Sequence, residues 1–356
     1  MLTGSVGNMT ITGLERRKRA ISKPILSNER NYQKGTAMMK IVILDGHAVN
    51  PGDLSWAPIQ ALGQVTVYDY TRPEDTAAHI GDASVVLTNK TLLTRQILDA
   101  CPGIRYIGVL ATGYNVVDLE AASERDIPVT NIPAYSTRTV AQFTFALLLE
   151  LCHHVGLHDA SVKAGDWIRS TDFCYWKTPA LELDGLTMGI VGFGQIGRQV
   201  ASIARSFGMD LLVSTPHPRP ELECEDLHFV SLETLLAQSD VVSLHCPLNA
   251  STRHLINRET LGLMKPGSLL INVSRGGLVD EPALRDALQS GHLSGAACDV
   301  ISAEPMEPDN PLLTAPNILL TPHIAWSSVA ARTRLVKIAA ENIRGWMDGT
   351  PQNRVG

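Results

Sequence analysis

Three side chains in the second half of the chain could together reduce a 2-oxo acid. Arg275 and His323 each follow an apolar stretch, and Glu304 lies between them in a Ser-Ala-Glu-Pro segment. A guanidinium offers a rigid fork of donors to a carboxylate, and a histidine supported by a glutamate can give a proton to a carbonyl oxygen. Singly, these residues could be a sheet-edge ion pair, a loop acid and a core histidine. Together, in this order, they predict a catalytic set for hydride transfer.

A glycine-rich turn indicates where a dinucleotide would bind. Residues 192–197 read Gly-Phe-Gly-Gln-Ile-Gly, between an apolar strand expected at 187–191 and a helix expected at 197–207. In this setting the glycines permit a tight turn, close approach to a pyrophosphate and close packing of helix on strand. The predicted cofactor residues of this turn are Gly192, Gly194, Gln195, Ile196 and Gly197.

The strand after this turn lacks the acid that normally accepts from the adenosine ribose hydroxyls in NAD enzymes. Residues 214–219 contain no Asp or Glu, and Asp210 lies at the beginning of the strand, which is the wrong end. Neutral Ser214 and Thr215 would not repel a 2′-phosphate, and Arg219 could pair with it. We expect NAD(H) or NADP(H), with a slight preference for NADP. If Arg219 is simply a solvated loop residue, both cofactors are accepted.

Alternating strands and helices are expected to bring these residues to the carboxyl edge of a sheet, where open α/β folds bind ligands. Apolar strands are expected at residues 40–44, 83–87, 105–110 and 128–131, and then at 187–191, 210–213, 241–244, 268–273, 295–300 and 318–321. Helices are expected at 94–100, 117–125, 139–154 and 327–346, among others. Strands that are apolar throughout suit sheets covered on both faces. The predicted fold class is therefore α/β, with two parallel sheets flanked by helices.

The composition excludes several classes of protein. With 356 residues, 44% of them hydrophobic and 19% charged, the chain is long enough for two domains and is not disordered as a whole. A net charge of −6 gives no global attraction to nucleic acid or anionic membranes, and no apolar run is long enough to cross a bilayer. Six widely spaced cysteines indicate reduced thiols, no metal site and a cytoplasmic location. The expected partner is a small molecule, with no nucleic acid and no membrane.

Residues 1–38 differ from the rest of the chain. They carry seven Lys and Arg against two Asp and Glu, a net charge of +5 that leaves −11 for the body. We expect a disordered N-terminal extension upstream of a start near Met38 or Met39. The alternative is that the basic run at residues 16–19 forms a nucleic-acid or targeting patch.

Several separated motifs resemble those of the D-isomer-specific 2-hydroxyacid dehydrogenases, over residues 39 to about 349. The matching motifs are residues 192–197, His245-Cys246-Pro247-Leu248 with Thr252, the segment around Arg275, Asp299, Glu304-Pro305 and Pro322-His323. Further segments are similar to the glycerate dehydrogenase, or hydroxypyruvate reductase, subgroup: residues 50–56, 110–115, 173–176 and Trp326. The missing ribose acid departs from the family pattern and puts the usual NAD preference in doubt.

The resemblance implies a division into domains and further site residues. Residues 39–138 and 325–349 would form a flavodoxin-like substrate domain, and residues 139–324 a Rossmann NAD(P)-binding domain. Besides the glycine turn, Ser214, Thr215 and Arg219, the implied cofactor residues are Val140, His245, Cys246, Pro247, Thr252, Val273 and Asp299. Among these, Asp299 would accept from the nicotinamide carboxamide. The implied substrate residues are Leu110, Ala111, Thr112, Gly113, Arg275 and Trp326, together with Lys90 unless that lysine is simply solvated.

The resemblance also implies an activity and an assembly. The expected reaction is the reduction of hydroxypyruvate to D-glycerate with NAD(P)H, and its reverse. Glyoxylate and other short 2-oxo acids are alternative substrates. A cofactor-sensing binding protein, like the corepressors of this fold, is a further alternative that the complete Arg, Glu and His set disfavours. A homodimer is expected, with the helix from residue 139 and the aromatic loop 167–176 among its contacts.

Overall fold

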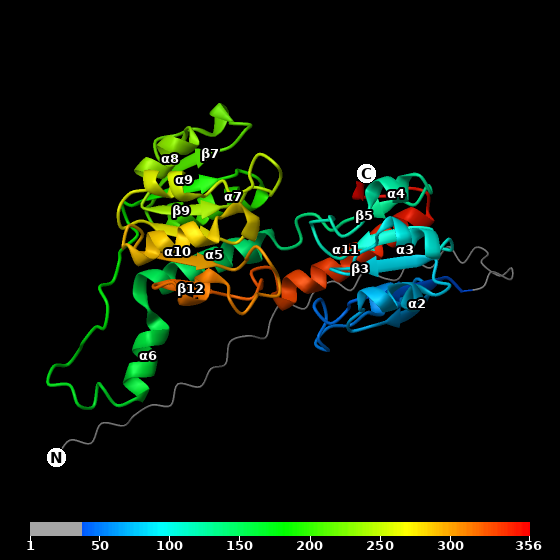
Figure 1. Ribbon diagram of the computed structural model, residues 1–356, viewed down its shortest axis with the longest axis horizontal. Helices are drawn as coiled ribbons and strands as arrows, with labels where there is room; N and C mark the ends of the chain where they lie inside the picture. Colours follow the sequence, from blue (N-terminus) through cyan, green and yellow to red (C-terminus); the bar gives the residue numbers. More distant parts are fainter. Residues whose placement is uncertain (1–37) are drawn as a thin grey trace, which may run out of the picture. The chain divides into compact units, whose positions relative to one another are not determined.

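Two β-sheets organise the part of the chain that the computed structural model describes, residues 38–356 (Figure 1). The expectations for the N-terminal extension therefore fall outside the described residues, apart from Met38 itself. Both sheets are parallel except for one edge strand, and helices flank them. The predicted α/β class with two parallel sheets is confirmed.

The first sheet has the strand order β13-β5-β4-β3-β1-β2. Its strands are β1 (Lys40–Ile43), β2 (Gln64–Val67), β3 (Val85–Thr88), β4 (Tyr106–Val109), β5 (Val129–Thr130) and β13 (Arg354–Val355). Only β13 is antiparallel, and it pairs with β5 at the edge. The five parallel strands follow the flavodoxin-like order 2-1-3-4-5. Because the order reverses between β1 and β3, ligands are expected at the carboxyl ends of these two strands.

Helices cover both faces of the first sheet. They are α1 (Ala57–Gln60), the 3-10 helix η1 (Pro73–Asp75), α2 (Thr76–Ile80), α3 (Arg95–Ala100), α4 (Leu119–Ser123) and α11 (Val329–Met347). Successive strand residues face opposite sides, so Val86 packs in one core with Leu98 of α3 and Leu87 packs in the other with Leu335 of α11. The last long helix thus returns to the first sheet, as predicted.

The second sheet has the strand order β12-β11-β10-β9-β6-β7-β8, and all its strands are parallel. The strands are β6 (Thr187–Val191), β7 (Asp210–Ser214), β8 (Leu227–Phe229), β9 (Val241–Leu244), β10 (Leu269–Asn272), β11 (Gly295–Cys298) and β12 (Ile318–Leu320). Numbered from β6, the order is 3-2-1-4-5-6-7, which is the Rossmann order with one additional strand. Its order reverses between β6 and β9, next to the glycine turn.

Two layers of helices enclose the second sheet. They comprise α5 (Thr137–His153), α7 (Gln195–Ser206), α8 (Leu232–Gln238), α9 (Arg258–Leu263) and α10 (Glu281–Gln289), with the 3-10 helices η2 (Pro220–Leu222), η3 (Gly276–Leu278) and η4 (Pro311–Thr314). The helix α6 (Val155–Lys163) follows α5 and extends away from the sheet (Figure 1). One core joins Leu148 of α5 and Val200 of α7, and the other joins Leu235 of α8 and Leu284 of α10. Within residues 38–356, no single helix is long and apolar enough to cross a bilayer. Only α5 and α6 taken together reach that length and composition, and they are bent by 56°.

The structure adds elements that the sequence analysis does not predict. The strands are β2, β8 and β13, of which β8 and β13 have three and two residues. The helices to which the sequence analysis gives no residue range are α1, α2, α6, α8, α9 and α10. The long helix predicted over residues 139–154 ends at His153, because His154 adopts a left-handed conformation with a φ of 46°. The residue limits of the two domains, 138/139 and 324/325, stay a prediction.

Candidate active site

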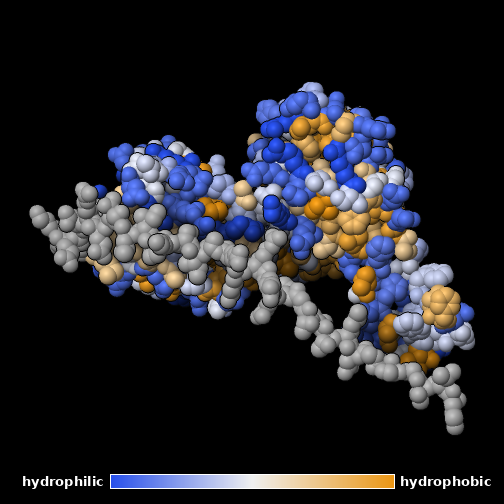
Figure 2. Space-filling model, turned by 180° about the vertical axis from the view of Figure 1, so that it is seen from behind, coloured by the Kyte–Doolittle hydropathy of each residue, from blue (hydrophilic) through white to orange (hydrophobic). Residues whose placement is uncertain are grey.

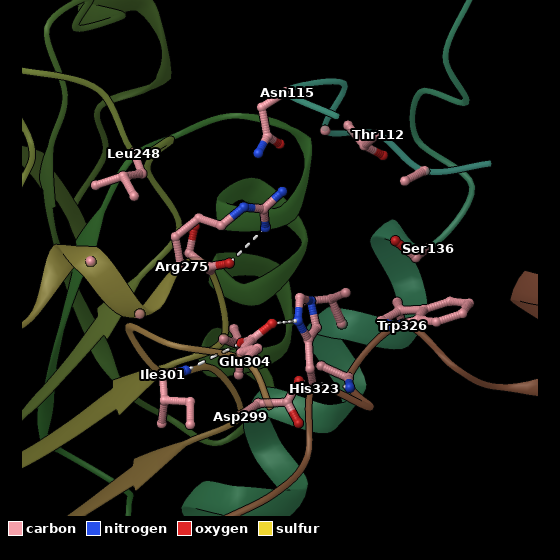
Figure 3. A pocket seen from close by; sticks show the side chains of 18 of the residues that line it. Thr112, Asn115, Ser136, Leu248, Arg275, Asp299, Ile301, Glu304, His323 and Trp326 are labelled. Carbon is pink, nitrogen blue, oxygen red and sulfur yellow. Dashed lines mark hydrogen bonds and ion pairs between the residues drawn. The ribbon is translucent and has the colours of Figure 1, made fainter. Parts of the chain in front are cut away.

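A cavity of about 360 Å³ lies at the carboxyl-end loops of both sheets (Figure 3). Its lining includes all three residues of the predicted catalytic set, Arg275, Glu304 and His323. Other predicted residues that line it are Lys90, Ala111, Thr112, Gly113, Val140, Ile196, His245, Val273, Asp299 and Trp326. The fold therefore brings residues from both halves of the chain to one space.

His323 and Glu304 form a hydrogen-bonded pair in this cavity (Figure 3). Nδ1 of His323 donates to a carboxylate oxygen of Glu304 at 2.7 Å, so Nε2 is the nitrogen left for a substrate. Glu304 also accepts from the backbone N–H of Ile301 at 3.3 Å. Partial burial disfavours its charged form, but the hydrogen bond and charge of His323 outweigh this and hold the pKa of Glu304 below its usual value. Glu304 is therefore ionised at neutral pH and holds the imidazole of His323 in place through Nδ1.

The turn that carries His323 is built around the buried carboxylate of Asp299. His323 has a φ of 55°, and its backbone N–H donates to the Asp299 carbonyl at 2.8 Å. The Asp299 carboxylate accepts from the backbone N–H groups of Ile324 and Ala325 at 2.9 and 2.8 Å. It also accepts from the hydroxyl of Thr321 at 2.6 Å. Burial raises the pKa of this carboxyl, although the three donors oppose the shift. These bonds determine where the imidazole points.

Arg275 reaches the cavity from the loop that follows β10. Within residues 38–356 its guanidinium forms no ion pair, and it donates to the carbonyl of Ser274 at 2.7 Å (Figure 3). A Cβ on Gly113 would lie 2.7 Å from Nη2 of Arg275. Glycine at this position therefore lets the guanidinium approach the backbone of the loop after β4. The structure brings Arg275 and the predicted substrate segment 110–113 together.

The glycine turn between β6 and α7 has the shape that a pyrophosphate requires. Gly192 has a φ of 94°, and a Cβ there would lie 2.7 Å from the backbone nitrogen of Cys246. A Cβ on Gly194, in contrast, would have nothing within 4 Å. Gly194 is also the N-cap of α7 and provides no side-chain partner for the first N–H groups of the helix. An open face and unsatisfied donors suit the phosphates of a nicotinamide dinucleotide.

Two matches to known proteins decide the family of this chain. The family model described as D-isomer specific 2-hydroxyacid dehydrogenase, NAD binding domain, matches residues 145–325. A hydroxypyruvate reductase of Blautia hydrogenotrophica is 49% identical over 320 residues, which cover 89% of this chain and 99% of that protein. The chain belongs to the D-isomer-specific 2-hydroxyacid dehydrogenase family. This dehydrogenase is accordingly an NAD(P)-dependent oxidoreductase.

Two further proteins are similar to this dehydrogenase over most of its length. A glycerate dehydrogenase of Methylorubrum extorquens is 38% identical over 285 residues, covering 80% of this chain and 88% of that protein. The solved structure of an NADPH-dependent glyoxylate/hydroxypyruvate reductase of Sinorhizobium meliloti, in complex with NADP and malonate, has a TM-score of 0.77 and 28% identity. That match covers 90% of this chain and 97% of the other. The family predicted from separated motifs is confirmed.

The remaining predicted residues of the dehydrogenase lie outside the lining of the cavity. Those of the glycine turn are Gly192, Gly194, Gln195 and Gly197, and the others are Leu110, Ser214, Thr215, Arg219, Cys246, Pro247 and Thr252. Leu110 and Cys246 are buried, and the hydroxyl of Thr252 donates to the carbonyl of Pro247 at 2.7 Å. Ser214 ends β7, where Ser214 and Thr215 are half-buried, and Arg219 is exposed without an ion pair among residues 38–356.

His245 lines the cavity of the dehydrogenase as a neutral imidazole. Its Nε2 lies 2.8 Å from the hydroxyl of Ser243, and burial lowers the pKa of His245 to about 3. The cavity thus contains one histidine that stays uncharged at neutral pH and one, His323, that is paired with a carboxylate.

Sequence reasoning missed several residues that line the dehydrogenase cavity. They are Asn89, Asn115, Val116, Tyr135, Ser136, Leu248, Ser274, Gly276, Gly277, Ile301, Ser302 and Ala325. Asn115 and Leu248 belong to motifs that carry the family resemblance, but the sequence analysis assigns them no role in the site. Asn89 could have been found, because it is a polar residue directly after an apolar strand. Tyr135 and Ser136 carry no such signal, since their position depends on where the chain leaves the first sheet to begin α5.

Proposed function

We propose that this chain reduces hydroxypyruvate to D-glycerate with NAD(P)H and catalyses the reverse oxidation. The observation that carries the proposal is a Glu304-bonded His323 beside Arg275, whose guanidinium has no ion-pair partner in residues 38–356. A proton donor and a carboxylate-binding cation on one cavity fit a 2-oxo acid. The names of the relatives from Blautia hydrogenotrophica and Methylorubrum extorquens support a three-carbon hydroxy acid. Glyoxylate is the alternative, supported by the name of the Sinorhizobium meliloti reductase.

Each member of the catalytic set has a separate role in the proposed reaction. Arg275 binds the substrate carboxylate with two donors and is assisted by the backbone of residues 110–113. His323 donates from Nε2 to the C2 carbonyl oxygen and gives that oxygen its proton as the double bond is reduced. Glu304 stabilises the imidazolium before the transfer. The bound nicotinamide supplies the hydride that C2 gains. In the reverse direction, neutral His323 takes the proton from the C2 hydroxyl.

The cofactor is held by the predicted residues around the glycine turn. The full set is Val140, Gly192, Gly194, Gln195, Ile196, Gly197, Ser214, Thr215, Arg219, His245, Cys246, Pro247, Thr252, Val273 and Asp299. Our finer proposal is a slight preference for NADP, because Ser214 and Thr215 carry no charge and Arg219 is exposed. Replacing Arg219 by serine should lower the NADPH-to-NADH ratio of kcat/KM about tenfold, as expected for one charge-assisted contact. An unchanged ratio would identify Arg219 as a solvated loop residue.

The proposed assembly is a homodimer that uses the segment after α6. Trp167, Ile168, Phe173 and Trp176 are 52%, 88%, 87% and 75% exposed. Figure 1 shows α6 extending away from the other helices around the second sheet, and Figure 2 shows hydrophobic side chains on this projecting segment. A cluster of this kind suits burial against a second copy of the chain. Light scattering should give twice the mass of the chain, and a Phe173→Ser, Trp176→Ser variant should be monomeric. A monomeric parent protein would refute the proposal.

Two broader expectations also remain proposals. The division into a substrate domain (39–138 and 325–349) and a cofactor domain (139–324) can be tested by limited proteolysis with and without NADPH. A cytoplasmic location agrees with six free cysteines and can be tested by cell fractionation.

A steady-state assay tests the proposed function directly. Hydroxypyruvate and glyoxylate are each offered with NADH and with NADPH, and the loss of cofactor absorbance is followed. The proposal expects the highest kcat/KM with hydroxypyruvate. Cofactor binding without turnover of either substrate would refute it and would favour the cofactor-sensing alternative.

A further inference from the structure

A second cation, Lys90, lines the cavity that contains Arg275. Within residues 38–356 its ammonium group forms no ion pair. Lys90 is exposed to the solvent of the open cavity. Partial desolvation and the charge of Arg275 lower the pKa of Lys90, while Glu304 and Asp45 oppose the shift. A short 2-oxo acid has one carboxylate, which Arg275 can bind alone. The cavity therefore has one more cationic side chain than the carboxylate needs.

The backbone on both sides of Lys90 is held by a buried carboxylate. Asp45, which is 9% exposed, accepts from the backbone N–H of Asn89 at 2.7 Å and of Thr91 at 2.8 Å. It also accepts from the backbone N–H of Lys90 itself. Three consecutive N–H groups on one carboxylate determine the course of the turn, because each charge-assisted bond restricts it further.

A further hydrogen bond connects this turn to the substrate segment. The side-chain amide of Asn89 donates to the carbonyl of Leu110 at 2.7 Å. Leu110 begins the segment 110–113, against which the Arg275 guanidinium lies. These hydrogen bonds hold the backbone of Lys90 next to the segment 110–113, where the substrate carboxylate is expected to bind.

The location of the turn agrees with a role in ligand binding. Asp45 lies two residues after β1, and residues 89–91 follow β3 directly. The order of the first sheet reverses between β1 and β3, and ligands bind at such a reversal in open α/β sheets. Lys90 therefore lies at the edge of the first sheet where a ligand is expected.

We propose that Lys90 determines substrate specificity by donating a hydrogen bond to the hydroxyl at C3 of the substrate, and that Asp45 is the positioning residue that holds it there. This inference rests on the proposed function. Hydroxypyruvate and D-glycerate carry a C3 hydroxyl, whereas glyoxylate and glycolate have no third carbon. A site built to hydrogen-bond a substrate hydroxyl discriminates against a ligand that lacks this hydroxyl.

The test compares substrates in the wild type, Lys90→Met and Lys337→Met. Lys337 is a matched lysine that is 73% exposed on α11, away from the cavity lining. Lys90→Met should lower the hydroxypyruvate-to-glyoxylate ratio of kcat/KM at least tenfold, and Lys337→Met should leave this ratio unchanged. Equal losses for both substrates, or no loss, would overturn the inference.

Asp45→Asn separates positioning from simple destabilisation. The amide replaces an acceptor by a donor that faces backbone N–H groups, so the turn should loosen with Lys90 still present. The hydroxypyruvate-to-glyoxylate ratio of kcat/KM should fall at least threefold, mainly through KM for hydroxypyruvate. A variant that merely unfolds in part would lose both activities in proportion, with an unchanged ratio, and would refute the positioning role.

Binding measurements separate this inference from the proposed function. Calorimetry with NADP⁺-loaded protein gives the affinities of D-glycerate and glycolate in the wild type and in Lys90→Met. Loss of D-glycerate affinity alone, in a wild type that turns over no 2-oxo acid, would support the inference and refute the proposed reaction. Turnover of hydroxypyruvate with unchanged affinities in Lys90→Met would refute only the inference.

Discussion

Replacing Gly113 by alanine tests whether the close approach of Arg275 to the loop after β4 is needed for catalysis. The added Cβ would lie 2.7 Å from Nη2 of Arg275 and 3.6 Å from Oδ1 of Asn115. Ordinary contact begins at 3.4 Å, so the guanidinium must retreat by about 0.7 Å. Because the obstructing atom is the end of a flexible side chain, we expect the free energy of unfolding to change by less than about 1 kcal/mol.

The effect on activity should be much larger than the effect on stability. Misplacing the guanidinium weakens a charge-assisted contact of about 1.5–3 kcal/mol, which corresponds to a loss of about 10- to 150-fold in kcat/KM. KM for hydroxypyruvate should rise, and kcat should fall as well, because the carbonyl carbon is displaced from the hydride donor.

The assay combines steady-state kinetics with urea unfolding, and Gly103→Ala is the matched control. A Cβ on Gly103 meets nothing within 4 Å, so this variant should keep both activity and stability. If Gly113→Ala retained the wild-type kcat/KM with a folded structure, the assignment of Arg275 and the 110–113 segment to the substrate carboxylate would be wrong.

Three further outcomes can be measured with single substitutions. Glu304→Gln replaces the carboxylate that accepts from Nδ1 of His323 at 2.7 Å by a neutral amide. The imidazole is then held less firmly, so kcat for reduction should fall at least about tenfold; an unchanged kcat would contradict the role of Glu304. Gly194→Ala should leave the free energy of unfolding of the cofactor-free protein unchanged and raise the Kd for NADPH at least about tenfold. Gly192→Ala should instead destabilise the fold by about 3 kcal/mol or more. Equal effects of the two substitutions would contradict the proposal that the open side of the glycine turn binds the phosphates. The pKa of His245 falls from 6.5 in the unfolded chain to about 3 in the fold. Between these pH values the unfolded state binds more protons, so the free energy of unfolding should decline as pH falls, by at most about 1.4 kcal/mol per pH unit. In chemical denaturation, His245→Gln should show a smaller decline over this pH range.

The features that could be predicted from the sequence are those that depend on residues close together along the chain. The glycine turn, the apolar strands and the polar residues just after them are local patterns, so these patterns alone suffice to place Arg275, Glu304 and His323 on one sheet edge. Strand ends are not set by such a pattern: β10 is shorter by one residue at each end than the expected strand at 268–273.

The features that could not be predicted depend on contacts between distant segments. Nothing near Asp45 in the sequence indicates that its carboxylate accepts from backbone N–H groups of residues 89–91. The need for glycine at position 113 arises only when Arg275, far along the chain, packs against it. The edge strand β13 pairs with β5, which lies more than 200 residues earlier in the chain, and β13 has only two residues, too few for a recognisable strand pattern. Such pairings have no signature in the local order of side chains.

The return of α11 to the first sheet has a consequence for the order in which the chain can fold during synthesis. All strands of the second sheet lie between residues 187 and 320, so that sheet is complete before α11 has been made. One core of the first sheet needs Leu335 and Ile343 of α11, and its edge needs β13. Although the first sheet begins at Lys40, one of its faces stays uncovered until the residues of α11 and β13 have left the ribosome. The first sheet therefore begins to be synthesised before the second sheet, but its core is completed after it.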